Sequence, residues 1–265
     1  MIRLFLVAML LAAPAMAEPL ILQSTTSTQN SGLYDAILPP FSKETGIDVH
    51  VVAVGTGQAL KNAQNCDGDL LLVHAKDAEL AFIAAGYGTR RDALMYNDFV
   101  VVGPTQDAAA IGGIASILKA LQVLDLRKLT FVSRGDDSGT HQAEMALWNL
   151  AGLDPARNSG SWYLETGSGM GATLNTAVGL GAYTITDRAT WVRYANKQGF
   201  DILVAGDPLL FNQYGIVTLN PSHCPNANHT DAAILRDWLL GETGQAAISE
   251  FRIGGEQVFF PNATP

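Results

Sequence analysis

Short apolar runs alternate with segments of helical spacing along most of this chain. In the helical segments, apolar residues recur every three to four positions, as they do on one face of a helix. The apolar runs, which we predict as strands, are residues 20–23, 47–54, 69–74, 98–103, 129–133, 162–165, 182–186, 201–205 and 215–219. The predicted helices are residues 31–45, 59–64, 78–85, 141–150, 172–180 and 231–240. This alternation predicts an α/β fold with mixed, mostly parallel sheets flanked by helices.

Two turns that directly follow apolar strands, residues 103–105 and 206–208, are the predicted domain boundaries. The chain is long enough for two domains of ordinary size. Because there are two boundaries, we expect the chain to cross from a first lobe to a second and back. The first lobe is then discontinuous, residues 18–102 plus 207–265, and the second is residues 103–206. Ligands of such sheets bind beyond the carboxyl ends of the strands, so the sequence predicts a ligand cleft between the lobes.

Residues 1–17 have the pattern of a secretory signal peptide. Arg3 precedes an apolar run at residues 4–13, and Ala15 and Ala17 provide the small residues of a cleavage site. The run is too short for a membrane anchor, which needs ~20 apolar residues. We therefore expect residues 1–17 to be removed and the protein to be periplasmic.

Charge and cysteine content narrow the range of partners. The chain carries 16 basic and 25 acidic residues, a net charge of −9, and it has no cluster of Lys and Arg. This composition argues against nucleic acid as a partner. In the periplasm, Cys66 and Cys224 either form a disulfide or stay as two unpaired, apolar side chains. A metal site is not expected, because neither cysteine lies in a CxxC pair.

Hydroxyl and glycine residues collect where predicted strands lead into helices. These turns read STTST at 24–28, GTGQ at 55–58, SRGDDSGTH at 133–141 and TGSGMGA at 166–172. The start of a helix presents unpaired backbone amides, glycine lets a ligand approach them, and hydroxyls add donors without charge. Arg134 supplies one full positive charge, and its guanidinium can reach two oxygens of an oxyanion at once. Taken together, the turns predict an anion site.

Each turn also has a purely structural explanation. Serine and threonine are favoured as helix N-caps, so any one of these turns taken alone is typical of a cap. A cap does not need an arginine, however, and Arg134 shares its loop with Ser138 and Thr140. The loop at residues 133–141, called the arginine loop below, is therefore the sharpest indication of a ligand.

Several stretches that extend over nearly the whole chain after residue 17 match one family when they are taken in order. They are STTSTQNSGL at 24–33, VGTGQAL at 54–60, LLLVHA at 70–75, MYNDFVVVGP at 95–104, SRGDDSGTHQAE at 133–144, GSGMGATLN at 167–175 and AYTITDR at 182–188. Together they resemble the periplasmic tungstate-binding proteins that supply ABC transporters. That family usually opens with three threonines and a serine; here Ser24 replaces the first threonine and keeps its hydroxyl.

The resemblance implies a two-lobed periplasmic binding protein of type II that closes on its ligand and catalyses no reaction. It implies tungstate as ligand, the membrane permease of an ABC transporter as partner and no cofactor, and we expect a monomer. The ligand-binding residues that it implies are Thr25, Thr26, Ser27, Thr56, Gly57, Arg134, Ser138, Gly139 and Thr140, with Gly171 and Ala172 as further amide donors. The arginine loop also resembles that of the related phosphate-binding proteins.

A proton-free dianion suits these residues best. Phosphate keeps a proton near neutral pH and needs a carboxylate acceptor, whereas tungstate and molybdate need donors only. Asp136 and Asp137 lie in the arginine loop, where we expect them to cap the next helix and orient Arg134. His74 and His141 are either core or capping residues, or they face the ligand. The sequence does not rank tungstate against molybdate, and another tetrahedral oxyanion is the alternative ligand.

An exported enzyme is the alternative from another class. Residues 167–172 fit the GxGxxA form of the dinucleotide fingerprint, and Asp187 lies twenty residues after its first glycine. This fingerprint normally follows the first strand of its domain, however, and residue 167 does not. For a hydrolase, the chain has neither HExxH nor GxSxG, and Asp137, Ser138 and His141 share one helix start that suits caps better. We therefore expect a binding protein and not an enzyme.

Overall fold

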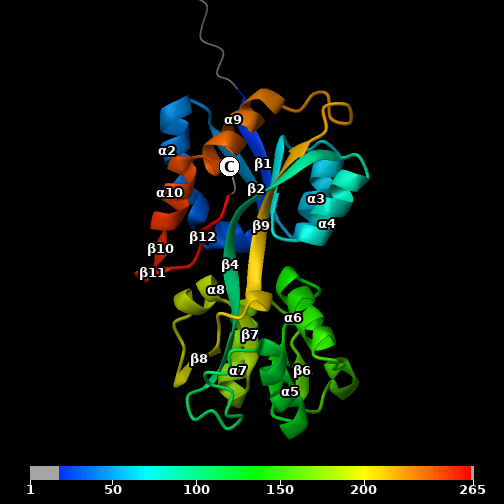
Figure 1. The fold of residues 1–265 in the computed structure, drawn as a ribbon, viewed down its shortest axis with the longest axis vertical. Helices are drawn as coiled ribbons and strands as arrows, with labels where there is room; N and C mark the ends of the chain where they lie inside the picture. Colours follow the sequence, from blue (N-terminus) through cyan, green and yellow to red (C-terminus); the bar gives the residue numbers. More distant parts are fainter. Residues whose placement is uncertain (1–17, 264–265) are drawn as a thin grey trace, which may run out of the picture.

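The computed structural model describes residues 18–263, so the predicted signal peptide at residues 1–17 lies outside the described residues. Over the described part of the chain, no helix is both long and apolar enough to cross a membrane. The described residues form two lobes, the upper and lower halves of Figure 1, and long antiparallel strands join them.

The first lobe is built on a sheet with the strand order β12-β4-β9-β3-β1-β2. Strand β1 runs parallel to β2 and β3, whereas β9 runs antiparallel to β3 and β4. The strands are β1 (Leu20–Thr25), β2 (Val49–Val54), β3 (Leu70–Val73), β4 (Gly88–Pro104), β9 (Phe211–Leu219) and β12 (Phe260–Pro261). The helices are α1 (Thr26–Asn30), α2 (Leu33–Thr45), α3 (Thr56–Gln64), α4 (Lys76–Ala84), α9 (His229–Leu240) and α10 (Glu242–Glu250). Helices α2, α9 and α10 cover one face of the sheet, and α3 and α4 cover the other (Figure 1).

The second lobe uses the other half of β4. There β4 pairs antiparallel with β7 and β8, and β5 pairs in parallel with β6. The strands are β5 (Phe131–Ser133), β6 (Tyr163–Glu165), β7 (Thr184–Asp187) and β8 (Phe200–Val204). The helices are α5 (Ile117–Arg127), α6 (Gly139–Leu150), α7 (Met170–Leu180) and α8 (Arg188–Arg193), with short 3-10 turns at Pro155–Asn158 and Pro208–Leu210. A short antiparallel pair, β10 (Arg252–Ile253) and β11 (Glu256–Gln257), lies near the end of the chain and contacts α8.

Strand β4 changes partners in its middle, and this is where the chain passes between the lobes. Up to Asp98 it pairs with β9, and from Phe99 onward it pairs with β7 and β8. Strand β9 brings the chain back, beginning at Phe211 opposite Asp98. The two strands lie side by side along the long axis of the molecule (Figure 1).

We therefore define the first lobe as residues 18–98 and 211–263, and the second lobe as residues 99–210. Residues 99–102 and 207–210, which the sequence analysis assigns to the first lobe, contact the second lobe in this structure. The reason is that β4 passes from one lobe to the other without a break. The turn at residues 103–105, which is a predicted boundary, therefore lies at the end of the part of β4 that belongs to the second lobe. The exact boundaries stay a prediction.

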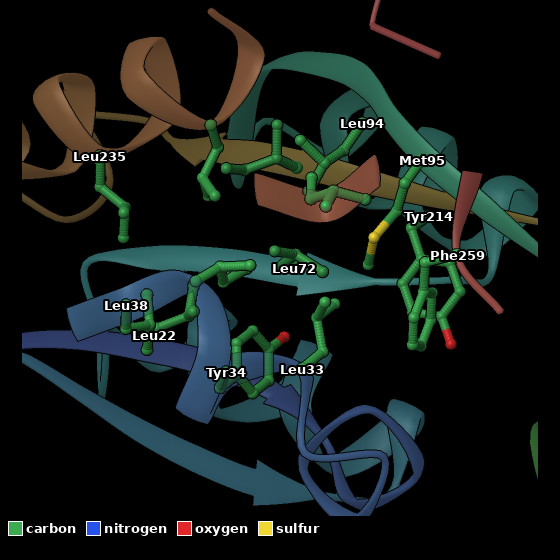
Figure 2. Close-up of a cluster of buried hydrophobic side chains, with 14 of the residues drawn as sticks. Leu22, Leu33, Tyr34, Leu38, Leu72, Leu94, Met95, Tyr214, Leu235 and Phe259 are labelled. Atoms are coloured by element: carbon green, nitrogen blue, oxygen red, sulfur yellow. The ribbon is translucent and has the colours of Figure 1, made fainter. Parts of the chain in front are cut away.

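The predicted mixed α/β architecture is confirmed. Strand β3 is completely buried because it lies inside the sheet, with helices over both faces. Helix α2 turns its apolar face inward: Figure 2 shows Leu33, Tyr34 and Leu38 pointing toward Leu22 of β1 and Leu72 of β3. The helix ends where Gly46 adopts a left-handed φ of 75°, a conformation that glycine reaches without strain.

Some elements are not visible in the sequence pattern. Strand β4 begins at Gly88, well before the predicted residue 98, and α5, α8 and α10 are additional helices. The first half of β4 carries charged side chains, which are not typical of a strand inside a sheet. Arg91 is accommodated there because its Nε lies 2.5 Å from Oε2 of the buried Glu79 in α4. This pairing depends on the tertiary fold.

Cys66 and Cys224 form a disulfide, which settles the alternative left open by the sequence. It connects the chain just after α3 to the loop that follows β9. Both segments belong to the first lobe, so the bond joins the outgoing and returning parts of that lobe.

Candidate functional site

All the residues predicted to bind a ligand line two adjoining hollows between the lobes. The arginine hollow, about 370 Å³, is lined by Thr25, Thr26, Ser27, Thr56, Gly57, His74, Arg134, Asp136, Asp137, Ser138, Gly139 and Thr140, among others. The α8 hollow, about 600 Å³, is lined by Gly171, Ala172, Asp187, Arg193 and others. Thr26, Ser27, Arg134 and Thr140 line both. Turns from the two lobes thus converge, while the ligand contacts themselves stay a prediction.

The hydroxyl run lies at the junction of β1 and α1. Ser24 points into the core, where its hydroxyl donates to the carbonyl of Leu72 at 2.8 Å. Thr25 Oγ1 lies 3.1 Å from Ser27 Oγ and 2.8 Å from Thr28 Oγ1. Thr26 and Ser27 are exposed to the hollows. Ser24 is therefore a structural residue. Thr25 lines the arginine hollow but is buried, so the exposed hydroxyls of the run are those of Thr26 and Ser27.

Within the arginine loop, the side chain of Arg134 is held in place by Asp136. Arg134 Nη2 lies 2.5 Å from Asp136 Oδ2, and the amide of Ser138 donates to Asp136 Oδ1 at 3.2 Å. Burial raises the pKa of Asp136, but the hydrogen bonds from Ser138 and Arg134 outweigh it and hold that pKa below its ordinary value. Arg134 Nε is buried and has no hydrogen-bond partner among the described residues. Asp136 thus orients the guanidinium through Nη2, and Nε is among the donors left for a ligand.

Helix α6 begins at the end of the arginine loop and faces the first lobe. Ser138 is its N-cap, and the Ser138 hydroxyl accepts from the amide of His141. At Gly139, a side-chain Cβ would lie 3.3 Å from Cε1 of His74 and 4.0 Å from Oγ1 of Thr56. The start of α6 therefore lies against the end of β3 and the turn at residues 55–58 of the first lobe, and glycine permits this approach.

Asp137 and His141 bind within the loop. The amide of Asp137, whose φ is 57°, donates to Nδ1 of His141 at 3.0 Å. Oδ1 of Asp137 accepts from Gln142 Nε2 at 3.3 Å. Asp137 lines the arginine hollow, whereas His141 lines neither hollow. Both residues make contacts within the loop, but Asp137 does not cap α6 as expected, because the N-cap is Ser138 and Asp137 binds the Gln142 side chain instead.

In the fourth turn, one of the two predicted amide donors already has a partner. Gly171 and Ala172 lie in the first turn of α7 and line the α8 hollow. The amide of Ala172, however, already donates to the carbonyl of Gly169 at 3.1 Å. Gly171 is thus the better of the two candidate amide donors.

Comparison with known proteins places these features in a family. Residues 12–240 match a family described as "PBP superfamily domain". "Tungstate-binding protein TupA" of Peptoclostridium acidaminophilum is 45% identical over 248 residues, which cover 92% of this chain and 86% of that protein. The solved structure "Tungstate binding protein - TupA - from Desulfovibrio alaskensis G20" has a TM-score of 0.88 and 44% identity, and covers 94% of this chain and 100% of that one. This chain belongs to the TupA family of tungstate-binding proteins.

A more distant member of the same family shows how far the match extends. "Tungstate-binding protein TupA" of Campylobacter jejuni is 38% identical over 241 residues, covering 89% of this chain and 88% of that protein. The resemblance drawn from the sequence is thereby confirmed, as is the two-lobed fold.

Two features of this TupA-family site were not predicted from the sequence. Glu144 of α6 is buried beneath the arginine loop, where its carboxylate accepts from Ser133 Oγ and Tyr163 Oη, each at 2.8 Å, and from Trp148 Nε1 at 3.1 Å. Burial raises the pKa of Glu144 from 4.5 to about 7. Ser133 Oγ in turn accepts from the amide of Gly135, so Glu144 supports the loop from below.

The other unpredicted feature is a set of contacts around His74. Its two ring nitrogens lie 3.2 Å from Ser27 Oγ and 3.2 Å from Asn212 Oδ1. Burial lowers the pKa of His74 below its ordinary value of 6.5, so the ring is neutral at physiological pH. The sequence pattern placed a histidine at the end of a strand. It could not show the contact with Asn212, because that residue lies in β9, far away along the chain.

The geometry around Asp187 does not suit the dinucleotide alternative. Asp187 is the N-cap of α8, and its oxygens accept from the amide and the hydroxyl of Thr190 at 2.8 Å and 2.6 Å. A fingerprint acid must instead bind a ribose hydroxyl. The family members found by comparison are binding proteins by name.

Proposed function

We propose that this protein binds the tungstate oxyanion in the periplasm and delivers it to the permease of an ABC transporter. The observation that carries the proposal is the convergence of turns from both lobes around Arg134, whose buried Nε has no partner in the described residues. The names of its relatives support the same ligand. We propose that the protein acts as a monomer, without cofactor and without catalysis.

The chemistry of the arginine hollow favours an anion that carries no proton. Hydroxyls, amides and a guanidinium supply hydrogens. Of the two carboxylates that line this hollow, Asp136 is engaged by Arg134 and Ser138, and Asp137 accepts from Gln142. Tungstate and molybdate can accept from all these donors, whereas hydrogen phosphate also needs an acceptor for its own proton. Molybdate is the second candidate ligand, because it has the same charge and shape.

Competitive calorimetry with tungstate, molybdate, sulfate and phosphate on one sample tests the proposal. We expect both metalates to bind and phosphate to bind far more weakly. The melting temperature should also rise with tungstate, because a ligand at a hundredfold excess over its Kd stabilises the folded state by about 2.7 kcal/mol. No change in melting temperature with either metalate would contradict the proposal.

Substitution of Arg134 tests the site itself. Arg134→Ala should weaken tungstate binding by about 2–4 kcal/mol, because it removes a charge-assisted contact from a site with few other charges. Arg134→Lys keeps the charge but loses the planar fork, so we expect an intermediate loss. The matched control is Arg157→Ala in the second lobe, where the side chain is 83% exposed and pairs with Asp154. Near-normal affinity in Arg134→Ala would remove Arg134 from the site.

A further inference from the structure

His74 links the arginine hollow to the strands that join the lobes. It follows β3, its Nε2 contacts Ser27 Oγ in the hollow, and its Nδ1 contacts Asn212 near the start of β9. Its ring also packs on Tyr214, with ring centroids 4.8 Å apart. His74 therefore has a fixed orientation, and each of its ring nitrogens has one partner.

The orientation of two asparagine amides gives the direction of this hydrogen-bond chain. Asn212 Nδ2 donates to Asn97 Oδ1 at 2.9 Å, and Asn97 Nδ2 donates to the hydroxyl of Tyr214 at 3.3 Å. Asn212 thus offers its carbonyl oxygen to His74, and this oxygen can only accept. Nδ1 of His74 therefore carries the hydrogen. In the neutral ring Nε2 is then an acceptor, so the hydroxyl of Ser27 donates to it.

A hydrogen bond in which Ser27 donates to His74 is unfavourable for binding an anion that carries no proton. While the Ser27 hydroxyl donates to His74, it has lone pairs and no hydrogen to offer to the hollow. An imidazolium ring, in contrast, carries hydrogens on both nitrogens. Its Nε2 would donate to Ser27 Oγ, and the Ser27 hydrogen would become available to a ligand.

We propose that His74 takes up a proton from solvent when the oxyanion enters the arginine hollow, and that the reversed His74–Ser27 hydrogen bond makes the Ser27 hydroxyl a donor to the anion. The inference rests on the proposed function, because it requires an anion in this hollow. Protonation also places a second positive charge near Arg134, which favours a dianion over a monoanion.

The surroundings of His74 are compatible with this change of charge. The charged side chains that line hollows together with His74 are Arg134, Asp136, Asp137, Lys76, Asp77 and Asp187. Without a ligand, burial has the largest effect and keeps the ring neutral, although Asp187 and Asn212 act to raise its pKa. A dianion a short distance away stabilises the imidazolium and raises the pKa further.

Calorimetric titration with sodium tungstate in two buffers of different ionisation enthalpy measures the proton directly. Because the proton is taken up on binding, affinity should increase as pH falls, by up to about tenfold per pH unit between the pKa values of the unliganded and liganded protein. His74→Asn keeps an amide that can donate to Asn212 but cannot titrate, so its binding should show neither proton uptake nor this pH dependence. His50→Asn, at an exposed position of β2, is the matched control and should keep both.

Nitrogen NMR of His74 in the wild-type protein provides a test that needs no variant. Nε2 should change from the shift of an unprotonated to that of a protonated ring nitrogen when tungstate is added. Equal apparent heats in the two buffers, or equal proton uptake in His74→Asn, would overturn this inference and leave tungstate binding intact. No heat with tungstate at any pH would overturn the proposed function and this inference together.

Discussion

At the scale of single residues, the site depends on groups beneath the arginine loop as well as on those that line it. The hydroxyl turns and Arg134 could be predicted because each lies within a short stretch of sequence. Glu144 could not, because its partners Ser133 and Tyr163 reach it only after β5, β6 and α6 have packed together. The only feature of the sequence that could indicate such a buried acid is an acidic residue on the apolar face of an amphipathic helix.

Glu144 leads to a prediction about pH. Its pKa is about 7 in the folded protein and 4.5 ordinarily, so its ionisation opposes folding. The protonated carboxyl of Glu144 therefore contributes about 3 kcal/mol to the free energy of unfolding. This contribution is fully present below pH 4.5 and is lost as the pH rises to about 7. Glu144→Gln should remove this dependence, because its amide stays neutral. Urea unfolding of both proteins at pH 5 and pH 8 measures the difference.

The control for Glu144 is Glu250→Gln at the exposed end of α10. It should retain the wild-type pH dependence. If Glu144→Gln lost as much stability between pH 5 and pH 8 as the wild type, the titrating group would have to be another residue.

At the scale of elements, the site is formed by helices that begin where strands of both lobes end. The sequence pattern located most of these junctions, because a buried strand and an amphipathic helix have different periods. It did not show the first half of β4, where Arg91 is balanced by Glu79, nor α8, which is only six residues long. Those elements depend on partners that are distant in sequence.

The start of α6 gives a prediction about the fit between the lobes. In Gly139→Ala, the new Cβ would lie 3.3 Å from His74, closer than ordinary contact, but only when the lobes are together. Tungstate affinity should fall by about 1–2 kcal/mol. The unliganded protein should be as stable as the wild type or slightly more so, because alanine favours a helix over glycine.

Calorimetry and thermal unfolding of Gly139→Ala separate these two effects. Gly179→Ala in α7 is the matched control, since nothing lies within 4 Å of its Cβ position. It should keep full affinity. Unchanged affinity in Gly139→Ala would mean that the lobes do not approach this closely when the anion is bound.

At the scale of the whole molecule, the lobes meet through side chains as well as through β4 and β9. Arg188 of α8 binds both oxygens of Asp98, the residue at which β4 changes partners. Arg193 of α8 reaches across to the first lobe, and its Nη2 donates to the carbonyl of Ser31 at 2.6 Å. Arg193 also lines the α8 hollow, so its contact closes the cleft beside the proposed anion.

Loss of the contact between Arg193 and Ser31 should change how long tungstate stays bound. Because the contact joins the lobes without lying in the arginine hollow, Arg193→Gln should speed tungstate release and leave association nearly unchanged. Loss of one charge-assisted hydrogen bond suggests about a tenfold weaker affinity. Arg252→Gln is the control, since Arg252 donates to the carbonyl of Ser249 within the first lobe. Stopped-flow measurement of both rates decides the matter: if Arg193→Gln slowed association and left release unchanged, Arg193 would act on entry of the anion and not on closure.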